Sequence, residues 1–148
     1  MTGNPEGTLL IIEDSDDDYL FTKRAFKKAK LANPLNRCSG GDEALDYLFR
    51  RNGFEDAERP SIILLDLNMP GTNGHQVLAQ IKADAQLCRI PVIVLTTSDD
   101  PRDIERCYKA GANSYVQKPV DLDGFVTAMS RLKDYWFEIA LLPETTDS

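Results

Sequence analysis

The 148-residue chain is acidic, with a formal net charge of −7 and a sequence pI near 4.7. This length is enough for one domain that buries its own core. The acidic balance argues against a general nucleic-acid or anionic-membrane surface, because both need a basic footprint. The expected partners are therefore proteins or small ions.

Three cysteines, Cys38, Cys88 and Cys107, stand at wide spacings without the paired Cys-x-x-Cys arrangement of a zinc or redox site. They are typical of free thiols in a reducing cytosol. Residues 1–7 lack the basic and apolar regions of a signal peptide, and no apolar run approaches membrane-spanning length. These features predict a cytoplasmic protein that acts without a membrane.

Short apolar runs alternate with amphipathic helical stretches along the chain. Apolar runs bounded by turn residues predict strands, which we expect over residues 8–12, 35–39, 62–66, 91–95 and 114–117. The second run is only weakly apolar and predicts an edge strand. Apolar residues at helical spacing behind capping residues predict helices, which we expect over about residues 16–32, 42–49, 74–84, 101–110 and 122–137. Strand–helix units of this kind predict an α/β fold, a doubly wound five-stranded parallel sheet with helices on both faces.

The run 62–65 is unbroken and apolar, and Asp66 follows it directly before the turn residues 69–71. Such a run predicts a strand that is buried on both faces of a parallel sheet. Ligands and chemistry collect at the carboxyl ends of strands in open α/β sheets, so Asp66 is a candidate site residue. Taken alone, an aspartate after a strand more often caps a helix or forms a turn.

Polar side chains follow four of the five predicted strands. Glu13 and Asp14 follow the first strand, Asp66 the third, Thr96 the fourth and Lys118 the fifth. Because the carboxyl ends of parallel strands meet at one edge, we expect three carboxylates, a hydroxyl and an ammonium group to gather there. A carboxylate cluster of this size is costly unless a cation sits in it, and hard oxygen ligands suit Mg²⁺.

Each of these residues has a simpler explanation when it is taken alone. The acidic pair could cap the first helix, Thr96 could be a strand-end hydroxyl, and Lys118 could be a solvated lysine. Taken together, these explanations do not account for such residues at the ends of four of the five predicted strands. With a cation present, Asp66 could attack a phosphoryl group whose outer oxygens Lys118 and Thr96 hold. His75 has no partner histidine and is expected to be an exposed residue at a helix start.

From Leu9 to Leu132 the chain resembles a response-regulator receiver domain of two-component signalling. The residues that carry the resemblance stand in the family's order and at its spacing: Glu13-Asp14, Asp66 with Leu67-Asn68-Met69-Pro70-Gly71, Thr96, Tyr115 and Lys118-Pro119. The resemblance implies a flavodoxin-like sheet in the order 2-1-3-4-5. It also implies that Asp66 accepts a phosphoryl group from a histidine kinase.

The resemblance assigns roles to the other residues of the pattern. Thr96 and Tyr115 would be the pair that moves on phosphorylation, and Lys118 would contact the phosphoryl group. Two positions depart from the family pattern, because Glu13 stands where aspartate is commoner and Thr97 where a smaller residue is usual. The implied Mg²⁺ ligands are Asp14, Asp66, the backbone carbonyl of Asn68 and, largely through water, Glu13.

The loop 50–60 and the aromatic C-terminal region resemble the small stand-alone regulators that serve cyanobacterial phytochromes. This resemblance implies a single receiver domain with a core of about residues 8–137, short tails at 1–7 and 138–148, no output domain, and a phytochrome-type histidine kinase as partner. A phosphorelay shuttle to another histidine protein remains an alternative. A phosphoaspartate phosphatase is disfavoured, because such enzymes require a second aspartate two residues after the nucleophile, and this chain has Asn68 there.

The end of the last predicted helix carries three consecutive aromatic residues, Tyr135, Trp136 and Phe137. Consecutive residues on a helix are about 100° apart, so one face cannot bury all three. Trp136 continues the inner stripe of the helix, which leaves an apolar patch around its neighbours. We expect a homodimer or kinase-docking surface there, with a tail folded back over its own domain as the alternative.

Overall fold

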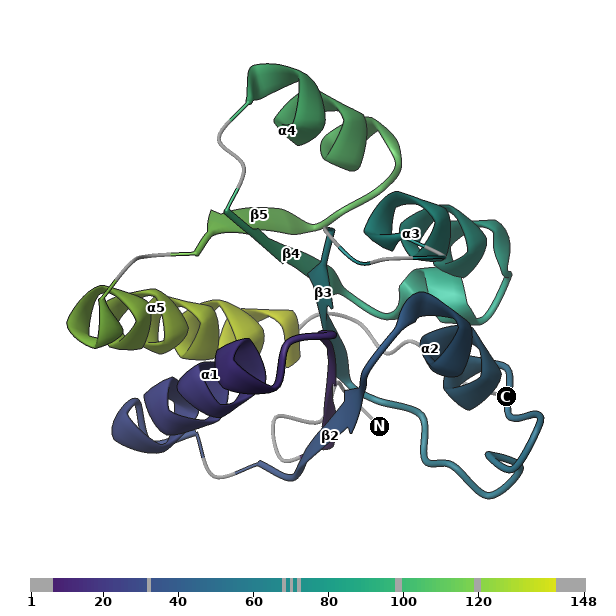
Figure 1. The fold of residues 1–148 in the computed structure, drawn as a ribbon, viewed down its shortest axis with the longest axis horizontal. Coiled ribbons are helices and arrows are strands. Elements are labelled where there is room, and N and C mark those ends of the chain that lie inside the picture. The colour runs from purple at the N-terminus through teal and green to yellow at the C-terminus, as the bar shows by residue number, and fades with distance from the viewer. Residues whose placement is uncertain are drawn as a thin grey trace.

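The computed structural model describes residues 7–31, 33–67, 69, 71, 73–97, 100–118 and 121–140, with the backbone alone for 132–133 and 135–140. Its five strands are β1 (Leu9–Ile12), β2 (Leu35–Cys38), β3 (Ile62–Asp66), β4 (Val92–Thr96) and β5 (Ser114–Gln117). They form one parallel sheet in the order β2-β1-β3-β4-β5 (Figure 1). The predicted α/β fold, the strand order and the edge position of the second strand are confirmed.

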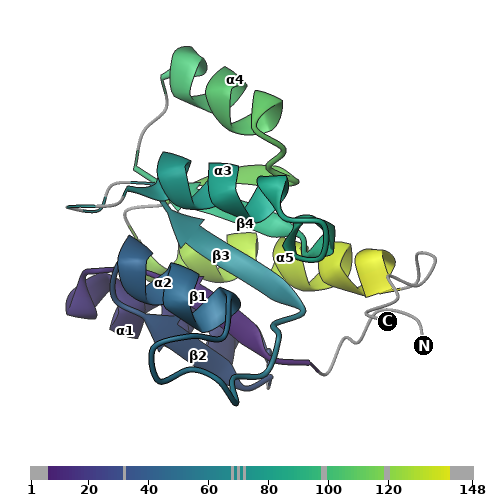
Figure 2. The same cartoon turned by 90° about the vertical axis from the view of Figure 1, so that its right-hand side faces the viewer.

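Helices cover both faces of the sheet. They are α1 (Asp16–Lys28), α2 (Gly41–Leu48), α3 (Gly74–Ala83), α4 (Pro101–Lys109) and α5 (Leu122–Ala140), with a short 3-10 helix η1 (Leu87–Arg89) before β4. Figure 1 shows α1 and α5 on one side of the sheet and α2 and α3 on the other. Helix α4 lies toward the β5 edge, beyond α3 (Figure 2).

The central strands are buried on both faces because every position in them is apolar up to the strand end. Alternate side chains of β1 and β3 point to opposite faces of a sheet. One set packs with α2 and α3, and it comprises Leu10, Ile12, Ile63 and Leu65. The other set packs with α1 and α5, and it comprises Leu9, Ile11, Ile62 and Leu64. The sheet therefore has two separate cores that share the same strands.

Side chains cap two helices as the sequence predicts. The Ser15 hydroxyl at the start of α1 accepts a hydrogen bond from the backbone N–H of Asp18. Asp100 caps α4 by accepting from the N–H of Arg102, and Pro101 occupies the first helical position. These caps fix the points at which the chain turns from the sheet edge into the helix.

The prediction that the first helix continues to about residue 32 is wrong, because α1 ends at Lys28. Lys30 adopts the left-handed backbone conformation with φ 62°, and the N–H of Leu31 donates to the carbonyl of Phe26. This arrangement is a common way for a helix to end. Ala32 itself lies outside the described residues.

Helix α5 continues to Ala140, three residues beyond the predicted end at residue 137. The side chains of Tyr135, Trp136 and Phe137 lie outside the described part of the structure, so the expected C-terminal surface stays a prediction. Among the residues that the structure describes, every helix is too short or too polar to cross a membrane.

Candidate functional site

The carboxyl ends of the strands are level with one another at one edge of the sheet. Ile12 pairs with Leu65 between β1 and β3, and Asp66 pairs with Leu95 between β3 and β4. Side chains from the residues that end or follow these strands therefore reach the same rim. The predicted site residues among them are Glu13, Asp14, Asp66, Thr96 and Lys118.

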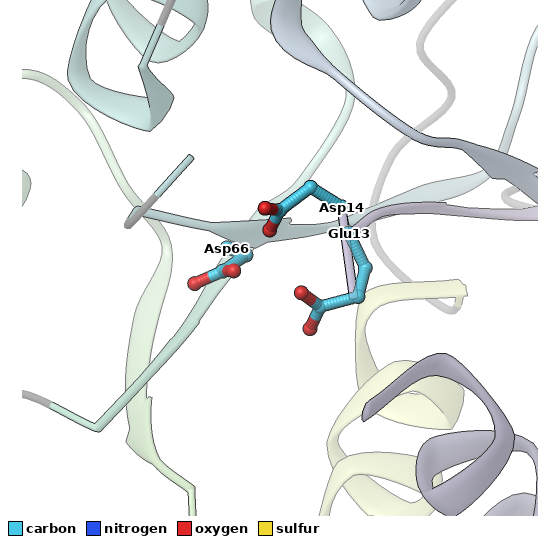
Figure 3. A group of neighbouring side chains, drawn as sticks. All are labelled: Glu13, Asp14 and Asp66. Carbon is cyan, nitrogen blue, oxygen red and sulfur yellow. The ribbon is translucent and has the colours of Figure 1, made fainter. Parts of the chain in front are cut away.

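Three carboxylates meet at this rim. One oxygen each from Glu13, Asp14 and Asp66 lies within 4.8 Å of the other two, and Figure 3 shows the three groups converging from the ends of β1 and β3. Glu13 and Asp66 are only 2% and 6% exposed, whereas Asp14 faces solvent. Like charges at this spacing oppose one another's ionisation, and a hard divalent cation relieves that cost. The donor set fits such a cation.

Lys118 supplies positive charge to the same rim. Its Nζ lies 2.6 Å from Glu13 Oε1, 3.1 Å from Asp18 Oδ2 and 3.8 Å from Asp66 Oδ2. Burial lowers the pKa of Lys118, but the hydrogen bond to Glu13 and the negative charge of Asp66 outweigh burial and raise that pKa above its ordinary value. The amine is therefore a charged ammonium at neutral pH.

Thr96 ends β4 and is fully buried, and its carbonyl accepts a hydrogen bond of 2.7 Å from the backbone N–H of Lys118. Tyr115 pairs with Val94 one strand further along and is half-buried against the core beneath α2 and α3. The structure thus brings Thr96 to the rim and places Tyr115 behind it on β5.

The loop after β3 packs two of its side chains into the core. Leu67 and Met69 are buried, while Asn68, whose backbone carbonyl is a predicted ligand, lies outside the described residues. The helix that follows starts very close to this loop. A Cβ atom at Gly74 would lie 2.6 Å from the Cα of Leu67 and would also clash with the carbonyl oxygen of Asp66. Glycine at this position therefore lets the helix approach the strand end.

Two contacts of the site could not be read from sequence spacing. Arg37 lies on the edge strand β2; its Nε donates to the carbonyl of Glu13, and its Nη1 pairs with Asp16 at 2.6 Å. Its guanidinium also lies over the ring of Tyr19 at 4.9 Å. Arg37 therefore holds the turn that carries the acidic pair. The other contact is the ion pair between Asp18 and Lys118. It could not be predicted, because an acidic residue in the first turn of α1 already has a sufficient local explanation.

The expectation that His75 is an exposed residue is wrong. Its side chain is half-buried, and among the described residues its Nδ1 has no hydrogen-bond partner. Burial lowers the pKa of His75, and the nearby positive charge of Arg106 on α4 lowers it further. His75 therefore lies partly covered at the start of α3, within electrostatic reach of Arg106.

Comparison with known proteins identifies the family. Residues 9–130 match the family model described as the response regulator receiver domain. The chain belongs to the response-regulator receiver family. The resemblance seen in the sequence is thereby confirmed, and so is the flavodoxin-like receiver fold.

Several members of this family are similar over nearly their whole length. The chain is 34% identical to the response regulator Rcp1 of Synechocystis sp. over 140 residues, which cover 95% of each chain. The phosphorylated cyanobacterial phytochrome response regulator RcpA superposes with a TM-score of 0.86 at 33% identity, over 94% of this chain and 99% of that one. The Mn²⁺-bound form of Rcp1 superposes with a TM-score of 0.83 at 33% identity, over 93% and 99%.

Proposed function

We propose that this receiver domain accepts a phosphoryl group on Asp66 from a histidine kinase in a Mg²⁺-dependent reaction, and that phosphorylation changes its partner-binding surface. The observation that carries the proposal is the position of Asp66. Its carboxylate is buried at the rim with two further carboxylates within 4.8 Å and the ammonium of Lys118 at 3.8 Å. This arrangement suits a carboxylate nucleophile next to a cation.

In the transfer, an Asp66 oxygen forms a bond to phosphorus while the bond from phosphorus to the kinase histidine nitrogen breaks. That nitrogen keeps the electron pair. Lys118 then binds one outer oxygen of the phosphoryl group, and the hydroxyl of Thr96 binds another. Tyr115 is the second residue that responds to the transfer.

A divalent cation would be held by Asp14, Asp66 and the carbonyl of Asn68, with Glu13 acting through water. When bound, Mg²⁺ supplies positive charge that offsets the phosphoryl oxygens and the carboxylates. The hard oxygen donors at the rim support this choice of ion, and the Mn²⁺-bound form of the similar protein Rcp1 supports a divalent metal.

We further propose a phytochrome-type histidine kinase as partner, because RcpA, which superposes closely, is a phytochrome response regulator. The proposed receiver spans about residues 8–137 and works in the cytoplasm. A net charge of −7 makes a nucleic-acid partner unfavourable. In this role the protein does not act as an enzyme on an external substrate, because the group that is phosphorylated is its own Asp66.

Acetyl phosphate with an isotopic label tests the function. The parent should take up one phosphoryl group per chain with Mg²⁺ and none with a chelator, and Asp66→Asn should abolish uptake while the protein stays folded. Asp56→Asn removes the same charge from an exposed loop residue and should label like the parent. Labelling of Asp66→Asn at the parent's rate would show that another residue is the acceptor.

We also propose that the C-terminal region from Tyr135 to Ser148 forms a homodimer or kinase-docking surface. Its apolar and aromatic composition supports this. Sedimentation at micromolar concentration should show an associated species, and truncation before Tyr135 should weaken association or phosphotransfer from the kinase. If truncation changes neither, the tail folds back over its own domain.

A further inference from the structure

A carboxylate outside the rim binds the ammonium of the site. Asp18 lies in the first turn of α1, and its Oδ2 is 3.1 Å from the Nζ of Lys118, which is 100 residues further along the chain. The Asp18 side chain is 52% exposed, whereas the Lys118 side chain is 11% exposed. Asp18 therefore reaches in from the solvent side toward a lysine that is largely enclosed.

Two carboxylates already hold this ammonium. An ammonium group has three N–H donors, and Lys118 directs hydrogen bonds to Glu13 at 2.6 Å and to Asp18 at 3.1 Å. Asp66 is more distant, at 3.8 Å. A phosphoryl group on Asp66 would place anionic oxygens near the same Nζ and compete with these partners.

Of the two present partners, Asp18 is the one that Lys118 can leave at lower cost. Glu13 is 2% exposed, and breaking its bond would leave a buried charge unpaired. Asp18 is half in solvent, so water can replace the ammonium as its partner, and exposed ion pairs of this kind are weak. A shift of Lys118 toward Asp66 would therefore be made at the expense of Asp18.

The space around this ion pair also permits the shift. A cavity of about 290 Å³ borders both side chains, and its lining residues are Asp17, Asp18, Phe21, Thr22, Thr97, Lys118 and Phe125. Side chains that border open space can change rotamer without repacking the core. Phe21 and Phe125, whose ring centroids are 5.3 Å apart, stack on each other, and both line this cavity.

We propose that Asp18 is a positioning residue that holds the Lys118 ammonium beyond hydrogen-bond distance of Asp66 until a phosphoryl group arrives. Asp18 thereby sets how tightly the site holds that group. The inference rests on the proposed role of Asp66. Removal of the Asp18 charge frees Lys118 for the phosphoryl oxygens and also removes one negative charge near them. Both effects tighten binding of an anionic phosphoryl group.

The test uses beryllium fluoride with Mg²⁺ as a non-covalent stand-in for the phosphoryl group, followed by ¹⁹F NMR. Asp18→Asn should bind it about threefold more tightly than the parent. Asp17→Asn is the matched control, because Asp17 loses the same charge from the same helical turn and lines the same cavity. Within the described part of the chain the structure records no bond between Asp17 and Lys118, so this control should bind nearly as the parent does.

A second measurement distinguishes positioning of Lys118 by Asp18 from the mere loss of one negative charge near the site. The ¹H–¹⁵N signal of the Lys118 ammonium in the free protein should shift or broaden in Asp18→Asn and stay in place in Asp17→Asn. Asp18→Glu, which keeps the carboxylate, should restore the affinity of the parent. Equal affinities or equal spectra in Asp18→Asn and Asp17→Asn would overturn the inference and leave the proposed function standing. Failure of the parent itself to bind beryllium fluoride and to take label from acetyl phosphate would overturn both.

Discussion

Helices α3 and α4 both follow strands that end at the site, but they are attached to the sheet very differently. Helix α3 buries residues along its whole inner face, namely Gly74, Val77, Leu78 and Ile81. Of the residues that the structure describes in α4, Cys107 alone is buried, and Tyr108 is 50% exposed. Figure 2 shows α4 lying outermost, beyond α3.

From this difference we expect the site to have one half that stays fixed and one half that moves. Asp66 precedes the well-packed α3, whereas Thr96 precedes the lightly packed α4. Local opening costs least where few apolar contacts are broken. A phosphoryl group bound between Asp66 and Thr96 should therefore leave α3 in place and displace α4.

The largest expected effect is the loss of cation binding and of phosphoryl uptake, without which neither helix would respond. Asp14→Ala removes a proposed cation ligand from the exposed side of the rim, so Mg²⁺ affinity and phosphoryl uptake should each fall more than about 100-fold. Because Asp14 contributes nothing to either core and its removal relieves repulsion among the carboxylates, the unfolding midpoint without Mg²⁺ should be at least as high as that of the parent. Calorimetric Mg²⁺ titration and acetyl phosphate labelling measure the two losses. Undiminished Mg²⁺ affinity in Asp14→Ala would contradict the assignment of the cation site.

Stability measurements on variants of the two helices test directly whether α3 is packed more firmly than α4. Leu78→Ala should lower the free energy of unfolding by about 2 to 5 kcal/mol, because this side chain on the inner face of α3 is fully buried. Tyr108→Ala on α4 should change it by less than about 0.5 kcal/mol. Urea unfolding followed by circular dichroism measures both. Similar losses in the two variants would mean that α4 is held as firmly as α3.

The coupling between the halves is expected to run through Thr96. Thr96→Ala should still take the phosphoryl group, because Asp66 and the cation ligands are intact, but the shift of α4 should be lost. Lys118→Ala should likewise retain some uptake without the shift. Chemical-shift maps before and after phosphorylation measure this, with Thr97→Ala, an exposed neighbour, as the control. If phosphorylated Thr96→Ala gives the map of the phosphorylated parent, Thr96 carries no coupling.

The site residues at the strand ends were the easier part of the site to predict. Asp66 could be placed because an unbroken apolar run must be a buried strand, and the residue after it must lie at the rim. Glu13, Thr96 and Lys118 followed by the same rule. The rule works because strand ends in a parallel sheet are aligned by hydrogen bonding rather than by side-chain detail.

Contacts between residues that are brought together only by the folding of the chain could not be predicted in this way. Asp18 has a sufficient local role at the start of α1, so nothing in the sequence signals its ion pair with a lysine 100 residues away. Gly74 reads as an ordinary helix start until the closeness of Leu67 is known. The end of α1 was missed because Lys30 adopts a left-handed conformation without a glycine or asparagine to signal it.

The smallest expected effect is a change in the alkylation rates of the three cysteines, which report how accessible each part of the core is. Alkylating reagents attack the thiolate, so reactivity depends on pKa and exposure. Burial, followed by the charge of Glu43, raises the pKa of Cys38 to about 12, and burial also raises the pKa of Cys107. Cys88 is exposed. At pH 8 iodoacetamide should therefore modify Cys88 first and the other two slowly.

Phosphorylation should change this pattern at one residue only. If α4 is displaced, Cys107, its one buried residue among those described, becomes more accessible and should react at least about threefold faster, while Cys38 beneath α2 keeps its rate. The measurement belongs at pH 8, because the folded Cys38 thiol stays protonated up to about pH 12 while the unfolded thiol ionises from about pH 9. Rising pH within that window therefore destabilises the fold and would expose every cysteine. Equal acceleration of Cys38 and Cys107 at pH 8 would indicate general loosening of the core rather than a movement of α4.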